Sequence, residues 1–187
     1  MPIKKAPKAR KVAILVADGF EQVELTKPQA ALRKSGFATD IVSPNPRKVK
    51  AMVHDKPGRV LRVGVPLSRA KPADYEALLL PGGVMNPDAL RQAPRAVRFV
   101  QAFFTERKPV AAICHGPIML IEADVVKERR LTSLPSIQTD LRNAGARWVN
   151  KTVAVDRGLV TSRKPADIPA FNRQMLRAFG SKRRSQG

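Results

Sequence analysis

The chain first becomes apolar at residues 11–17, which read KVAILVA. An unbroken apolar run of this length is typical of a strand that is buried on both faces of a parallel sheet. A helical pattern follows from Glu21 to Leu32, and Gly36 ends it at a position where glycine favours a left-handed cap. Residues 38–42 then read as a second strand. Residues 11–43 therefore predict a strand–helix–strand unit, the building block of a doubly wound fold.

The rest of the chain repeats this alternation of strands and helices. Apolar runs and turn residues predict further strands at 77–80, 110–113, 147–149, 153–155 and 159–162. Helical spacing predicts helices at 94–106, 117–123, 137–144 and 167–179. The stretch 44–76 is punctuated by prolines, and we expect 49–52 and 60–65 to form a hairpin at the edge of the sheet.

These elements predict one α/β domain over residues 11–180. We expect a doubly wound, mostly parallel, flavodoxin-like sheet with helices on both faces. Residues 1–10 and 181–187 are basic, and we expect them to be flexible tails. No apolar run reaches the length of a membrane span, and the N-terminus does not read as a secretory signal. A single cysteine cannot form an internal disulfide, so we expect a cytoplasmic protein.

The charge is strongly basic. Thirty-five Lys and Arg residues stand against fifteen Asp and Glu residues, which gives a formal net charge of +20. Such a surface attracts polyanions in a salt-dependent way. The basic residues are spread along the chain, however, only one Tyr and one Trp could stack on bases, and no nucleic-acid motif is present. We therefore expect non-specific association with polyanions and no specific nucleic-acid partner.

The candidate nucleophile is Cys114, the only cysteine, which stands where the strand 110–113 ends. His115, Gly116 and Pro117 follow it and lead into a short apolar helix. A strand that runs directly into a tight turn and a helix start presents a side chain for nucleophilic attack. The alternative is that Cys114 is a small, buried, inert residue at a strand end.

Two other strand ends carry groups that could act with Cys114. Glu21 follows the first strand, and Gly82-Gly83 follows the strand 77–80. In a parallel sheet such ends meet in one crevice. A protonated, buried Glu21 could stabilise a thiolate, the helix N-terminus would lower the pKa of the thiol, and the N–H groups of Gly83 and His115 could hold an oxyanion.

Each of these residues also has a structural alternative. Taken alone, Glu21 could be a solvated carboxylate, Gly82-Gly83 a simple turn and His115 a structural histidine. One cysteine and two histidines 61 positions apart have no zinc-ligand spacing, so we expect no metal. The occurrence of all three groups at strand ends favours a shared site.

Four stretches resemble the PfpI family, within the parkinsonism-associated superfamily of class I glutamine-amidotransferase-like fold. They are the nucleophile turn 112–117, the first loop 18–25, the second loop 78–83 and the C-terminal signature 161–171. Together they span roughly residues 11–180. The net charge of +20 is higher than this family leads us to expect, and Met52 stands where a larger aromatic residue would be unsurprising.

The resemblance implies a cofactor-free site with Cys114 as nucleophile, Glu21 as its carboxyl partner and His115 beside it. It implies oxyanion contacts from the backbone of Gly83 and His115. It also implies a homo-oligomer, a dimer or higher, in which an acidic residue of a neighbouring subunit approaches the histidine. Asp88 is the candidate for that acid, and His54 is a candidate for the pocket rim.

Members of this family are described as peptidases, glyoxalases, deglycases and stress proteins, which share addition of a thiolate to a carbonyl. We expect detoxification of small carbonyl compounds, by a glyoxalase or deglycase reaction in the stress response. The first alternative is an intracellular cysteine peptidase or amidase, which needs a base oriented by a third group. The second is a non-catalytic redox sensor, because an accessible thiolate oxidises readily. A nucleic-acid-associated role driven by charge is a further option.

Overall fold

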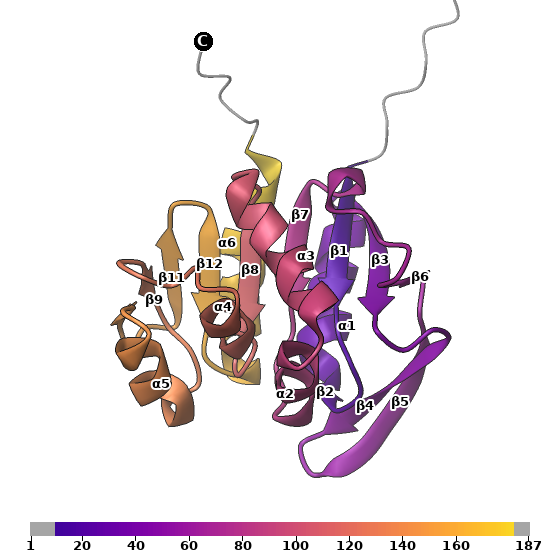
Figure 1. The fold of residues 1–187 in the computed structure, drawn as a ribbon, viewed down its shortest axis with the longest axis horizontal. Coiled ribbons are helices and arrows are strands. Elements are labelled where there is room, and N and C mark those ends of the chain that lie inside the picture. The colour runs from indigo at the N-terminus through magenta and orange to yellow at the C-terminus, as the bar shows by residue number, and fades with distance from the viewer. Residues whose placement is uncertain (1–9, 182–187) are drawn as a thin grey trace, which may run out of the picture.

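The central element of the protein is a seven-stranded sheet, seen in the computed structural model, which describes residues 10–181 (Figure 1). The strand order is β11-β12-β8-β7-β1-β3-β6, and every pair is parallel except β11 with β12. Their bounds are β1 Lys11–Leu15, β3 Ala38–Ser43, β6 Val65–Pro66, β7 Ala77–Leu80, β8 Val110–Ile113, β11 Val153–Asp156 and β12 Leu159–Ser162. The predicted doubly wound, mostly parallel fold is therefore confirmed. Of the predicted tails, 1–10 and 181–187, residues 1–9 and 182–187 lie outside the described part of the chain.

Helices cover both faces of this sheet. Figure 1 shows α2 (Met85–Arg91), α3 (Pro94–Thr105) and α4 (Ile118–Glu122) in front, and α1 (Gln22–Lys34) and α6 (Ile168–Gly180) behind. The helix α5 (Gln138–Asn143) packs against α4 and the short strand β10 (Arg147–Trp148). Short 3-10 turns occur at η1 (Pro72–Asp74), η2 (Pro135–Ile137) and η3 (Pro165–Asp167).

The alternation of side chains along β1 explains its unbroken apolar sequence. Ala13 and Leu15 pack into the core on the α3 side, with Phe99 and Phe103. Val12 and Ile14 pack into the core on the α1 and α6 side. Since successive residues of a strand point to opposite faces, a strand between two helical layers has to be apolar at every position.

The hairpin lies elsewhere than predicted. β4 (Lys48–Val53) and β5 (Lys56–Arg62) do form an antiparallel hairpin, but they join β2 (Phe20–Glu21) in a separate three-stranded sheet. The edge of the main sheet is β6 instead. The hairpin projects beyond the carboxyl ends of the strands (Figure 1), because β2 continues the loop that leaves β1 and pairs with β4 there.

The three strands that lead to the candidate residues are neighbours in the sheet. β7 pairs with β1 on one side and with β8 on the other, both in parallel. Their carboxyl ends therefore lie side by side at one end of the sheet. Both ends of the described chain lie at the opposite end (Figure 1). Two further short strands, β9 (Arg130–Leu131) and β10 (Arg147–Trp148), pair beside β11. Within residues 10–181 no helix combines the length and apolar character needed to cross a bilayer.

Candidate functional site

Cys114 sits on a strained turn at the end of β8. Its φ of 62° lies in the left-handed region, which non-glycine residues rarely adopt. The turn is closed by the N–H of Gly116, which donates to the carbonyl of Ile113 at 2.9 Å. A side chain at Gly116 would lie 2.5 Å from the carbonyl oxygen of Leu80, so only glycine fits. The result is a buried thiol, 8% exposed, held at the strand end.

The carboxyl group at the thiol belongs to Glu24, and the predicted pairing of Cys114 with Glu21 is wrong. Glu24 is fully buried in the first turn of α1, and its side chain forms a hydrogen bond with that of Cys114. Its Oε2 accepts the N–H of Gly82 at 2.8 Å. Its other oxygen, Oε1, is buried and has no hydrogen-bond partner among the described residues.

Glu21 lies one helical turn earlier and has a different partner. It is the last residue before α1, and its Oε2 accepts the N–H of His54 at 2.9 Å. His54 holds the β4–β5 turn with a φ of 58°. Glu21 therefore fastens the hairpin to the start of α1, and it stays close enough to Glu24 to raise the pKa of that group. A role for His54 at the pocket rim remains a prediction.

A buried asparagine that the sequence analysis missed holds the two loops together. Asn86 in α2 accepts the N–H of Ala17 at 2.7 Å through its Oδ1. Its Nδ2 donates to the carbonyl oxygens of Pro81 and Gly82, each at 3.0 Å. The amide thus links the end of β1 to the loop after β7. No local pattern in the sequence distinguishes Asn86 from an exposed helical asparagine.

The glycines of that loop allow close approach of the backbone. Gly82 lies between Glu24 and Cys114 and allows both to approach the backbone. A Cβ there would lie 2.5 Å from Glu24 Oε2 and 2.7 Å from the Cys114 Cβ. Gly83 has a φ of +83°, and a Cβ there would lie 2.3 Å from the carbonyl oxygen of Gly19. The N–H groups of Gly83 and His115 both donate to the Cys114 sulfur.

The pKa values of Glu24 and Cys114 are both raised, which contradicts the predicted low pKa of the thiol. Burial raises the pKa of Glu24 from 4.5 to about 8, so this carboxyl group is protonated at neutral pH. Burial and the charge of an ionised Glu24 raise the pKa of Cys114, while the N–H groups of Gly83 and His115 lower it. Below pH 8 the repulsion is absent, and Glu24 has a proton to donate to sulfur.

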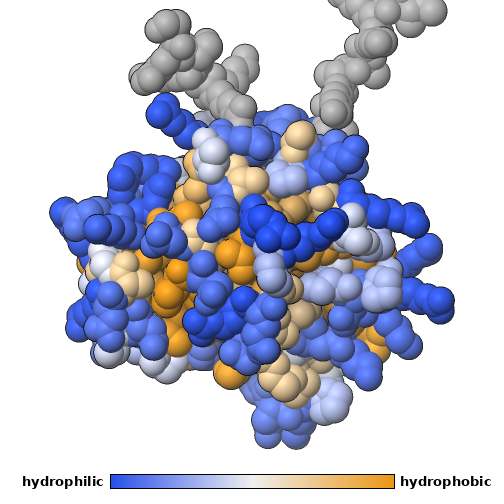
Figure 2. All heavy atoms as spheres, in the orientation of Figure 1, coloured by the Kyte–Doolittle hydropathy of each residue, from blue (hydrophilic) through white to orange (hydrophobic). Residues whose placement is uncertain are grey.

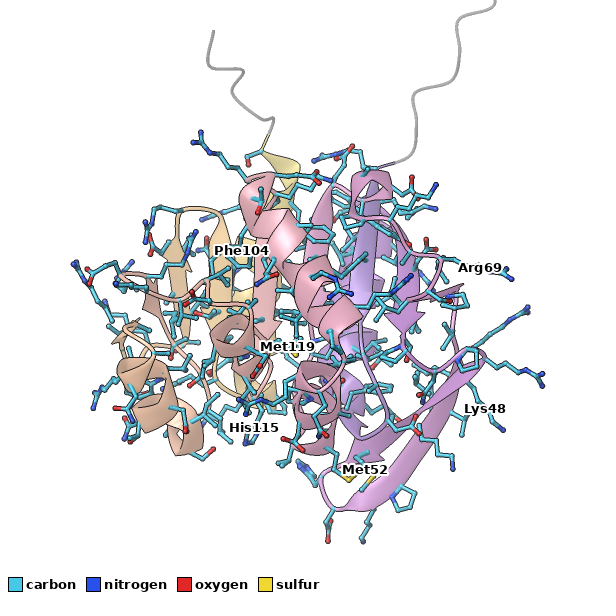
Figure 3. All side chains as sticks on the ribbon, in the orientation of Figure 1. Lys48, Met52, Arg69, Phe104, His115 and Met119 are labelled. Carbon is cyan, nitrogen blue, oxygen red and sulfur yellow. The ribbon has the colours of Figure 1, made fainter. Side chains whose placement is uncertain are left out.

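His115 connects the thiol to a serine far along the chain. Its Nδ1 lies 3.3 Å from the Cys114 sulfur and its Nε2 lies 3.2 Å from Ser136 Oγ. Burial lowers the pKa of His115, which keeps the ring neutral at pH 7. Figure 3 shows His115 at the edge of the sheet where β8 ends. Ser136 lies in η2, and the sequence carried no signal for it.

Asp88 lies in α2, where Gln92 donates to its main-chain carbonyl oxygen at 3.1 Å and to its carboxylate at 3.5 Å. Its predicted approach to the histidine of a neighbouring subunit remains a prediction. The buried position of Glu24, in contrast, does have a sequence signal. Glu24, Pro28 and Leu32 are spaced by four residues, which places them on one face of a helix, and all three are buried.

Comparisons with known proteins identify the family of the chain. The sequence profile of the DJ-1/PfpI family matches residues 10–178. The chain is 41% identical over 174 residues to an Escherichia coli protein named "Protein/nucleic acid deglycase 2", covering 92% of this chain and 99% of that one. It is 40% identical over 168 residues to a Bacillus subtilis protein named "Putative cysteine protease YraA", covering 90% and 97%.

Solved structures give the same answer for the fold. A two-domain Anabaena variabilis protein with DJ-1/ThiJ/PfpI-like and ferritin-like domains superposes with a TM-score of 0.86 and 32% identity, covering 95% of this chain and about half, 52%, of that one. Schizosaccharomyces pombe DJ-1 superposes with a TM-score of 0.80 and 23% identity, covering 92% and 93%, which supports the fold alone. The fold, the cysteine turn and the family profile agree, and the chain belongs to the DJ-1/PfpI family.

Proposed function

We propose that this protein is a cofactor-free thiol enzyme that acts on small carbonyl compounds, with a glyoxalase or deglycase reaction. The observation that carries the proposal is the contact between Cys114 and the buried Glu24, whose pKa of about 8 leaves it protonated at pH 7. A protonated carboxyl group beside a nucleophile can donate a proton as the nucleophile attacks. The relatives named as a deglycase and as a cysteine protease are consistent with such a thiol.

The first step is addition to an aldehyde such as that of methylglyoxal. His115 Nδ1, 3.3 Å from sulfur, accepts the thiol proton, and sulfur forms a bond to the aldehyde carbon. The carbonyl π electrons move to oxygen, and Glu24 supplies the proton that neutralises it. The product is a hemithioacetal on Cys114. The N–H groups of Gly83 and His115 stabilise negative charge throughout this step.

The second stage moves a proton between adjacent carbons and then adds water. Glu24, ionised by the first step, removes the proton from the former aldehyde carbon, and the ketone oxygen takes up the proton held by His115, which gives an enediol. The hydroxyl group on the sulfur-bearing carbon then loses its proton to His115, the neighbouring carbon receives the proton held by Glu24, and the adduct becomes the thioester of a 2-hydroxy acid. Water hydrolyses the thioester and frees the thiol. The net change adds one water to methylglyoxal and gives lactic acid, so no oxidant or reductant is needed.

The exposure of the thiol favours small substrates. Cys114 is 8% exposed in the protomer, and the carbonyl of a small aldehyde reaches such a sulfur more easily than a peptide bond does. In the deglycase form of the reaction, the same sulfur would attack the carbonyl-derived carbon of a newly glycated amine and release the amine.

A cysteine peptidase is the second candidate, and one contact favours it. A peptidase needs a histidine that is oriented by a third group. Ser136 Oγ, 3.2 Å from His115 Nε2, supplies such a group within the chain. When Nε2–H donates to this hydroxyl, Nδ1 presents its lone pair to the thiol. The histidine then has an orienting partner without a neighbouring subunit.

The test is production of lactate from methylglyoxal by the full chain, measured enantiomer by enantiomer. A single enantiomer separates enzymatic from spontaneous conversion. We expect activity in the wild type, none in Cys114→Ser, and a strong loss in Glu24→Gln. Glu21→Gln is the matched control, because it makes the same substitution one helical turn away. A panel of fluorogenic peptides, assayed with the same samples, tests the peptidase.

Each result assigns the function differently. Lactate production that is equal in wild type and Cys114→Ser rejects the carbonyl proposal. Peptide cleavage that depends on Cys114, without lactate production, selects the peptidase. A greater loss in Glu21→Gln than in Glu24→Gln rejects the assignment of the proton donor.

A further inference from the structure

A cleft lies at the amino-terminal end of β8, at the opposite end of this strand from Cys114. Its volume is about 390 Å³, and it is enclosed between the end of α3 and the turn from β11 to β12. The N–H of Val110, the first residue of β8, donates to Gly158 in that turn, whereas Cys114 follows the last residue of the same strand. The lining residues are Phe104, Arg107, Lys108, Arg129, Arg157 and Gly158.

Every charged residue that lines this cleft is basic. Lys108 is already neutralised, because its ammonium group contacts Glu106 at 2.6 Å and the carbonyl oxygen of Pro72 at 2.8 Å. Arg157 pairs with the neighbouring Asp156 at 3.2 Å. The Arg129 guanidinium group donates to the main-chain oxygens of residues 156 and 157, at 3.4 and 3.5 Å. Asp156 therefore faces both Arg129 and Arg157.

The guanidinium groups of Arg129 and Arg157 are held close to each other. Arg129 lies over the ring of Phe104, 5.1 Å from its centroid, and Figure 3 shows Phe104 towards the end of α3. Arg157 donates to the carbonyl oxygen of Glu128 at 3.0 Å. Burial, followed by the proximity of Arg157, lowers the pKa of Arg129, and Asp156 opposes this shift. An anion between the two groups would relieve this repulsion.

Two of the arginines occupy turn positions that favour smaller residues. Arg107, with a φ of 52°, is the left-handed residue that ends α3, a position that usually holds glycine. Arg157, with a φ of 46°, precedes Gly158 in the two-residue β11–β12 turn, where asparagine is favoured. Since the backbone does not favour arginine at either position, both residues can be replaced by residues that suit the turn better.

We propose that this cleft binds the phosphate group of a small phosphorylated molecule. Guanidinium groups match phosphate oxygens in paired hydrogen bonds, and the volume suits a small ligand. The ring of Phe104 provides an apolar wall for the rest of the molecule. The carbonyl groups at the end of α3 do not oppose the anion strongly, because the N–H groups of residues 106–108 already bond to them.

The surface around the cleft permits a rival explanation. Figure 2 shows hydrophilic side chains over much of this face, with apolar surface in patches between them. A protein with a net charge of +20 attracts any polyanion weakly. A specific site differs from this background in two ways. Its binding saturates, and its affinity depends on the named arginines when the ionic strength is held constant.

The experiment is calorimetric titration of the full chain with inorganic phosphate and with phenyl phosphate, at constant ionic strength maintained with sodium chloride. We expect saturable one-to-one binding, tighter for phenyl phosphate. The double variant R107G/R157N places favoured residues in both left-handed positions, so it should fold. We expect it to lose at least about tenfold in affinity, as removal of two charge-assisted contacts predicts. R62Q/R173Q removes the same charge elsewhere and should bind like the wild type.

The proposal would be overturned by titrations that do not saturate, by equal losses in the two double variants, or by phenyl phosphate that binds no tighter than inorganic phosphate. Thermal unfolding of each variant confirms that it is folded before titration. Binding that is lost in R62Q/R173Q as well, or that appears only with heparin or single-stranded DNA, assigns the effect to net charge and overturns the site. Cys114→Ser should leave phosphate binding unchanged, so this test is independent of the proposed enzyme activity.

Discussion

Glu24 and Cys114 lie close together on either side of Gly82. The Glu24 carboxyl group accepts the N–H of Gly82 and also forms a hydrogen bond with the side chain of Cys114. Neither group can be considered alone, since each one's ionisation changes the pKa of the other. The first predictions follow from this pair.

Activity should fall as the pH rises through about 8. Burial raises the pKa of Glu24 to about 8, so above that pH the proton donor is lost and an ionised carboxylate repels a thiolate. Glu24→Gln cannot ionise, and its alkaline limb should disappear while its activity at pH 7 falls by about 10²-fold, a typical contribution of a general acid. The profile of kcat/KM against pH measures both. An unchanged alkaline limb in Glu24→Gln would assign it to another group.

The stability of the fold should depend on pH in the same range. The folded pKa of Glu24, about 8, exceeds its ordinary value of 4.5, so the folded state binds more protons than the unfolded state between these values. Glu24 therefore contributes most stability below pH 4.5, and this contribution is lost as the pH rises to about 8. As the pH rises from 4.5 to about 8, we expect the Tm of Glu24→Gln to increase relative to the Tm of the wild type. Thermal unfolding measures both. Glu21→Gln should not share this trend.

Ser136 should act through the orientation of His115. Loss of one hydrogen bond of about 1 kcal/mol predicts a roughly fivefold fall in kcat for Ser136→Ala. Ser136→Thr keeps the hydroxyl and should restore much of the rate. The acid limb of the pH profile, set by a His115 pKa below 6.5, should also move in Ser136→Ala. A rate loss that is equal in Ala and Thr, with a fixed acid limb, would point to packing alone.

The sequence was sufficient to predict the sheet because its buried strands are unbroken apolar runs, as in Lys11–Leu15 and Ala77–Leu80. It was also sufficient to place Cys114 at the turn after β8, because a strand, a tight turn and a helix are consecutive there. The predicted carboxyl partner was three residues too early, at the glutamate nearest the strand end. The spacing of Glu24 with Pro28 and Leu32 places Glu24 on the buried face of α1.

Long-range contacts account for what the sequence could not predict. Ser136 reaches His115 because the N–H of Leu134 donates to the carbonyl oxygen of Cys114 at 3.0 Å, which brings η2 to the site. Asn86 likewise depends on the packing of α2 against the ends of β1 and β7. Such contacts join residues 20 to 70 positions apart, and no periodicity of a single segment encodes them.

Gly82→Ala tests whether this close packing is what brings the carboxyl group and the thiol together. The added Cβ would lie 2.5 Å from Glu24 Oε2, 2.7 Å from the Cys114 Cβ and 2.8 Å from the carbonyl oxygen of Ile113. Overpacking of this kind costs about 1–3 kcal/mol, and relief requires Glu24 and Cys114 to separate. We therefore expect a lower free energy of unfolding together with a shift of the alkaline limb away from pH 8. Gly180→Ala, where nothing lies within 4 Å, should be neutral or stabilising by about 0.5–1 kcal/mol. Chemical denaturation of both variants measures the stability. A stable Gly82→Ala protein with a wild-type pH profile would show that the pair does not depend on this contact.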